Sequence, residues 1–60
     1  MSSLALKALI SSINAQIDAL NNTNTKIYDE ENREFFLSNI RYIEDEDKLV
    51  FTTSEDRERL

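Results

Sequence analysis

The sequence predicts an α+β fold in which one N-terminal amphipathic helix packs on a small three-stranded antiparallel meander. Two observations favour this class. The first third of the chain carries apolar side chains at helical spacing, and the rest gathers β-branched and aromatic residues into three short runs separated by acidic tetrads. We expect residues 1–60 to form a single small domain, because a chain of 60 residues is too short for two hydrophobic cores.

The helix is predicted at about residues 3–21. Its apolar stripe alternates four- and three-residue spacing and consists of Leu6, Leu9, Ile10, Ile13, Ile17 and Leu20. Ser2 or Ser3 can cap its start. The polar run 21–24 contains three Asn, a residue that tolerates the left-handed conformation after a helix, so we expect the helix to end there.

Strands are predicted at about residues 25–28, 33–43 and 48–53. The four-residue segments 29–32 and 44–47 would form the hairpin loops, with Asn32 supplying a positive φ in a chain that has no Gly. Residues 54–60 form a charged tail, for which one helical turn capped by Thr53 or Ser54 is a further expectation.

The second predicted strand is open to another interpretation. Phe36, Ile40 and Ile43 also fit one face of a helix running from Asp29 to Glu46, which would make the fold mostly α, a helical hairpin plus a short C-terminal strand. If the segment is a strand, strict alternation puts Phe35 on the face opposite Phe36. One face then meets the helix and the other is exposed or in an interface, unless a kink or bulge hides more of it.

The composition excludes several kinds of chemistry. The chain has no Cys and no His, which removes disulfides, zinc fingers and an imidazole base. The acidic tetrads have the wrong spacing for a calcium-binding EF-hand, since Arg33 would take the fifth position of a loop starting at Asp29. We therefore expect no metal, no cofactor, no catalytic residue and no enzymatic activity.

Charge and hydropathy limit the classes of partner and the location that we expect. The net charge is −5, and nearly all of the acidic residues follow residue 25, so a phosphate backbone would be repelled and direct nucleic-acid binding is not expected. No stretch is long and apolar enough for a membrane span, and polar residues interrupt the only candidate for a secretory signal. The expected location is the cytoplasm of the producing or host cell.

The apolar stripe of the helix indicates self-association. Domains this small usually need disulfides, a metal or oligomerisation for stability, and only the last remains. The polar positions of the helix hold Ser, Asn and Gln rather than charged residues, which favours burial on more than one side. We expect a homo-oligomer, a dimer first, whose self-association seam is Leu6, Leu9, Ile10, Ile13, Ile17 and Leu20, and whose role is structural assembly or protein interaction.

Two alternatives stay open. An acidic inhibitor or adaptor could bind a basic host protein, as a nucleic-acid mimic of the phage anti-defence type, through Asp29, Glu30, Glu31, Glu44, Asp45, Glu46 and Asp47. Small size, acidity and lack of motifs suggest a phage or mobile-element product. The chain could also be an accessory subunit that folds only on a larger complex.

Overall fold

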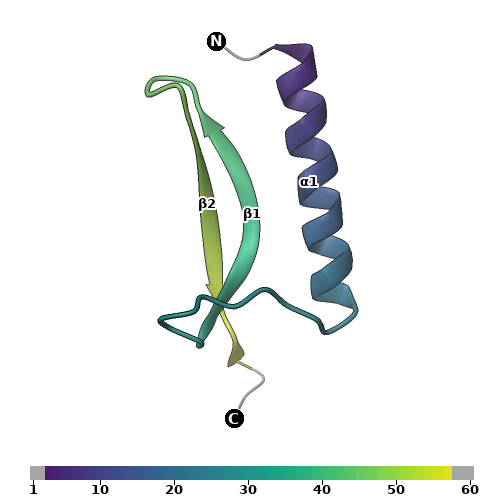
Figure 1. Cartoon of the computed structure of the whole chain (residues 1–60), viewed down its shortest axis with the longest axis vertical. Helices are drawn as coiled ribbons and strands as arrows, with labels where there is room; N and C mark the ends of the chain where they lie inside the picture. Colours follow the sequence, from purple (N-terminus) through teal and green to yellow (C-terminus); the bar gives the residue numbers. More distant parts are fainter. Residues whose placement is uncertain (1–2, 58–60) are drawn as a thin grey trace.

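The computed structural model describes residues 3–57 and has an α+β fold. Helix α1 (Leu4–Asn22) is followed by an antiparallel hairpin of β1 (Phe35–Ile43) and β2 (Lys48–Glu55), as Figure 1 shows. The mixed class is thereby confirmed. The mostly helical alternative is wrong, because residues 35–43 form a strand that pairs with β2. The strand predicted at 33–43 begins two residues later, because residues 33 and 34 lie in a turn in which the N–H of Phe35 donates to the carbonyl of Asn32.

Helix α1 lies within one residue of the predicted bounds at each end. The N–H of Leu6 donates to Oγ of Ser3 at 3.1 Å, so Ser3 is the N-cap. The chain leaves the helix through Asn24, whose φ is 64°. Asn adopts this conformation more readily than most residues, and the sequence has no Gly to take its place.

The hairpin contains one irregularity and one tight turn. The register shifts between Leu37 and Asn39, so a bulge at Ser38 breaks the strict alternation of β1. Residues 44–47 connect the strands as predicted, with Asp47 at a φ of 53°. Asn32 is not among the described residues with positive φ, so the role expected for it is wrong.

The third strand predicted at 25–28 is not formed. Only an isolated bridge joins Tyr28 to Phe36. The preceding residues are held at the helix end, where the N–H of Thr25 donates to the carbonyl of Leu20, and the chain turns again directly after Asp29. Only residues 27–29 remain to reach β1, which is too short for a strand.

The C-terminal expectation also changes. Thr53 and Ser54 belong to β2, which extends to Glu55, so neither caps a helical turn. The strand continues because Phe35 and Phe36 pair with Glu55 and Ser54. Residues 58–60 of the predicted tail, and Ser2 as a candidate cap, lie outside the described residues.

The elements lie side by side rather than stacked. In Figure 1, α1 runs along β1, and β2 lies on the far side of β1. Helix α1 contacts β1 and does not contact β2. The molecule measures 42 × 22 × 15 Å. A slab this thin buries little: Ile17, 5% exposed, is the only buried apolar residue in the described part of the chain.

Candidate interaction surface

The outer edge of β1, which faces away from β2, is closed in its middle by Asn14 of α1. Its Nδ2 donates to the carbonyl oxygen of Ile40 at 3.1 Å, and its Oδ1 accepts from the N–H of Ile40 at 2.8 Å. A side-chain amide carries the same donor and acceptor as a peptide group. Asn14 therefore satisfies the backbone of Ile40 as a neighbouring strand would.

Three more contacts close the first half of the same edge. Nδ2 of Asn21 donates to the carbonyl of Leu37 at 3.2 Å. The N–H of Leu37 donates to the carbonyl of Ile27 at 2.8 Å, and the N–H of Asp29 donates to the carbonyl of Phe35 at 3.0 Å. Helix and linker thus replace the missing third strand, and β1 is satisfied on this side from Phe35 to Ile40.

The outer edge of β2 is open. Because the backbone of Ile40 points to α1, its cross-strand partner Phe51 must also direct its N–H and C=O away from the hairpin. The same holds for Thr53, the partner of Leu37, and by alternation for Leu49. Within residues 3–57 no hydrogen bond reaches these outward groups of Leu49, Phe51 and Thr53. This edge is a row of free donors and acceptors.

The six residues of the predicted seam are divided between two environments. Ile17 is buried beside β1, and Leu6, Ile10 and Leu20 are half-buried. Leu9 and Ile13 are 59% and 40% exposed. The covered part of the stripe therefore packs on the chain's own hairpin. Leu9 and Ile13 lie four residues apart on a neighbouring line of the helix and stay exposed.

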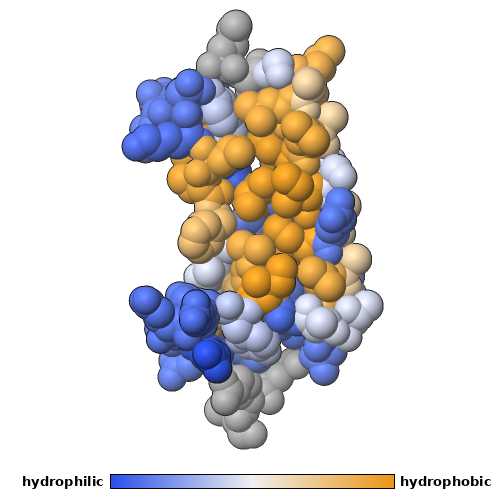
Figure 2. Space-filling model, viewed as in Figure 1, coloured by the Kyte–Doolittle hydropathy of each residue, from blue (hydrophilic) through white to orange (hydrophobic). Residues whose placement is uncertain are grey.

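The hairpin and linker expose further apolar side chains. Phe51 is 69% exposed, Leu49 52% and Ile27 48%. Figure 2 shows hydrophobic residues along α1 and over the middle of the hairpin, with hydrophilic residues at the two ends of the hairpin side. We call Leu4, Leu9, Ile13, Ile27, Tyr28, Leu49 and Phe51 the exposed apolar set.

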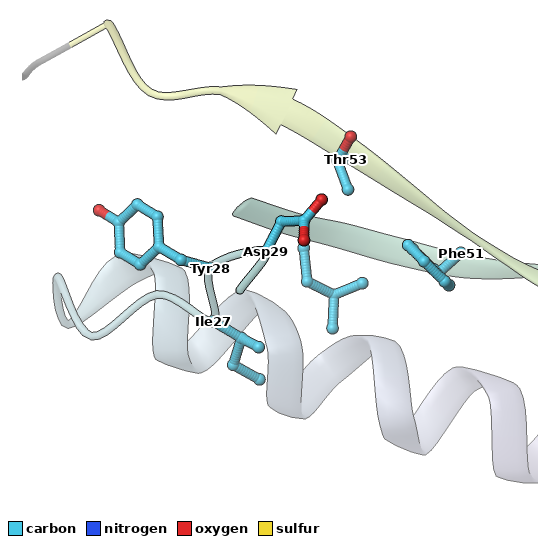
Figure 3. Close-up of a pocket in the computed structure, with 6 residues that line it drawn as sticks. Ile27, Tyr28, Asp29, Phe51 and Thr53 are labelled. Carbon is cyan, nitrogen blue, oxygen red and sulfur yellow. The ribbon is translucent and has the colours of Figure 1, made fainter. Parts of the chain in front are cut away.

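An open cavity of about 300 Å³ lies within this apolar region. Its lining consists of Ile27, Tyr28, Asp29, Leu37, Phe51 and Thr53. Figure 3 shows Ile27 from the linker and Phe51 from β2 on opposite sides of the hollow. Such a hollow can take an apolar side chain of a partner.

The acidic tetrads lie at two separate places. Residues 29–32 form the turn before β1, residues 44–47 form the hairpin turn, and all are exposed. At the hairpin turn the hydroxyl of Tyr42 donates to Oδ1 of Asp47. This hydrogen bond raises the pKa of Tyr42 to about 12 and lowers the pKa of Asp47. At the other end, Tyr28 donates to Oδ2 of Asp56 at 2.6 Å.

The part of the chain that the structure describes holds no group of three or more acidic side chains arranged to bind a metal ion. It also holds no helix that combines the length and the apolar character needed to cross a bilayer.

No protein family, curated protein or solved structure matches the chain.

Sequence reasoning missed the role of Asn14 and Asn21. Their spacing of seven residues, on the helix side that also carries Ile17, was the available signal.

Proposed function

We propose that this chain is a small, non-catalytic protein-interaction module that assembles with copies of itself, forming a dimer first. The observation that supports it most directly is the balance of burial. Among the described residues, Ile17 is the only buried apolar side chain, whereas seven large apolar side chains are exposed. A 60-residue chain with so little buried surface needs further cover to be stable.

The dimensions of the molecule support the same proposal. A slab of 42 by 22 Å presents a broad face for its mass. Contiguous exposed apolar surface of this kind usually marks an interaction site. A second copy is the partner that is present whenever the protein is made.

The distribution of charge favours assembly over charge mimicry. A nucleic-acid mimic needs a broad acidic face, but one acidic turn precedes β1 and the other follows it, so the two lie at opposite ends of that strand. Figure 2 shows hydrophobic residues between the hydrophilic ends on the face in view. An acidic inhibitor of a basic host protein therefore has less support.

The proposal is tested by measuring mass with light scattering from low micromolar to near-millimolar protein. We expect the apparent mass to rise from monomer to dimer. Replacing Leu49 and Phe51 together with Ser should weaken that rise, because both apolar side chains are exposed on β2, the strand that α1 leaves uncovered.

The matched control replaces Ala8 and Ala15 with Ser. Both are exposed on α1, outside the hairpin, so association should be unchanged. A folded monomer at the highest concentration would contradict the proposal.

A further inference from the structure

We propose that the open edge of β2 pairs, antiparallel, with the same edge of β2 in a second copy. The two hairpins would then form one continuous four-stranded sheet with an α1 at each outer side. This inference rests on the proposed self-association and specifies its geometry, including which residues lie opposite one another.

The β2 edge has the features of a pairing surface. Natural proteins protect exposed edges with Pro, charged side chains or bulges. Residues 49–54 of β2 contain no Pro and no charged residue, and the bulge of this hairpin lies in β1. The outer edge of β1 is already occupied by Asn14, Asn21 and the linker, so pairing is directed to β2.

Strand geometry leaves two registers that pair most of β2. The outward groups belong to every second residue, Leu49, Phe51 and Thr53. In an antiparallel pair related by a two-fold axis, these must face one another, so the axis passes through a residue and not between two. Only axes at Phe51 or at Thr52 keep nearly the whole strand paired.

Charge decides between the two registers. An axis at Phe51 sets Asp47 opposite the partner's Glu55, twice by symmetry, and like charges directly opposite destabilise a sheet. An axis at Thr52 sets Lys48 opposite the partner's Asp56 and Asp47 opposite the partner's Arg57, so each pair has opposite charges. The geometry points to the axis at Thr52.

The same register gives cover to the most exposed aromatic ring of the described chain. Phe51 lies beside Thr53 of the partner subunit and diagonally across from the partner's Phe51, on the same face. Diagonal neighbours in a sheet are about 7–8 Å apart, which aromatic side chains can span. Two rings that are each 69% exposed in the isolated chain would contact each other.

A disulfide test uses the natural absence of Cys. In the proposed register the two Thr52 residues meet at the axis as a non-hydrogen-bonded pair, with Cα atoms about 4.5 Å apart. That separation permits a disulfide. Thr52→Cys should become a covalent dimer on mild oxidation, and the matched control Thr53→Cys should cross-link at least ten times more slowly.

Each outcome of this experiment is informative once circular dichroism shows that both variants fold. Fast cross-linking of Thr52→Cys alone supports the register. A dimer by light scattering in which neither variant, or both equally, cross-links overturns the inference and leaves self-association standing. A monomer at all concentrations overturns both.

A charge variant provides a second readout. Lys48→Glu would oppose the partner's Asp56 and should raise the dimer Kd by about tenfold. Lys7→Glu makes the same change in net charge at an exposed position of α1 and should have a much smaller effect. Equal effects of the two variants would show that net charge, and not the pairing of Lys48, controls the Kd.

Discussion

The two outer edges of the hairpin are treated in opposite ways. Along β1, side-chain amides of α1 and the backbone of the linker bond the outward groups of Phe35, Leu37 and Ile40. Along β2, within the described residues, the outward groups of Leu49, Phe51 and Thr53 have no such bonds. One chain thus contains a protected edge and an unprotected one, in strands of almost equal length.

This contrast shows what α1 does in the fold. A helix usually covers the face of a sheet, and its side chains then fill a core between two layers. Here α1 lies along one strand, so its polar residues bond to backbone and its apolar residues are only partly covered. This position of α1 protects the β1 edge but leaves much apolar surface exposed.

The largest effect is expected from removing the anchor that holds α1 beside β1. Ile17→Ala deletes the only buried apolar side chain of the described region and should lower the free energy of unfolding by about 3 kcal/mol. Urea denaturation at fixed protein concentration measures it.

Ile13→Ala is the matched control for this prediction. Its side chain is 40% exposed, so the loss of unfolding free energy should be less than about half of the loss in Ile17→Ala. Equal losses would mean that α1 does not pack on β1 mainly through the face that carries Ile17.

The next effect concerns the protected edge itself. Asn14→Ala leaves the N–H and C=O of Ile40 without their partner and should cost about 2 kcal/mol of unfolding free energy. Amide hydrogen exchange at Ile40 should become faster. Asn22→Ala, at the exposed end of the same helix, should change neither measurement appreciably. Unchanged exchange at Ile40 in the Asn14 variant would show that the side chain of Asn14 is not what protects this N–H from solvent.

A proline substitution tests the unprotected edge. The N–H of Thr53 points away from β1, so Thr53→Pro removes no ladder bond of the hairpin and should change monomer stability by less than about 1 kcal/mol. In the paired dimer it deletes one bond from each copy and should raise the dimer Kd by about thirtyfold. Sedimentation velocity measures the association.

Thr52→Pro is the contrasting variant. Its backbone faces β1, opposite Asn39, so this substitution should destabilise the monomer itself. An intact dimer in the Thr53 variant would rule out β2 pairing.

The smallest effect is expected at the hairpin turn, where residues 44–47 are all exposed. The bond to Asp47 raises the pKa of Tyr42 to about 12, so its contribution to stability should be full below the ordinary tyrosine pKa of about 10 and be lost as pH rises through about 12. The lowered pKa of Asp47 adds stability above about pH 3.9 that is lost in stronger acid.

An NMR titration of the Tyr42 ring measures this pKa directly. In Asp47→Asn it should move back toward the ordinary value, because the carboxylate acceptor and its charge are gone. No movement would assign the shift to another cause.

The local parts of the fold were predictable from sequence. Helical spacing, the Ser3 cap and the polar run after Leu20 placed α1 within one residue at each end. The acidic run 44–47 placed the hairpin turn. Both depend on neighbours within a few positions, which the sequence shows directly.

The long-range parts were not predictable in the same way. The pairing of Asn14 with Ile40 spans 26 positions, and on a helix an Asn is more simply interpreted as solvated. The strand predicted at 25–28 does not form, because the N–H of Thr25 donates to the carbonyl of Leu20 at the helix end. The same difference applies to the proposed interaction surface. The seam residues could be predicted from their helical spacing, whereas the open edge of β2 could be identified only from the register of the hairpin.

The side-chain amide of Asn14 also sets a limit on stoichiometry. Growth of a sheet into a ribbon needs two reactive sides on every unit, so that each addition creates a new site for the next. If copies pair through β2 as we propose, pairing should stop after a single addition, because α1 of each copy already occupies the other outer edge of its hairpin. The assembly would then be a closed dimer and not a ribbon.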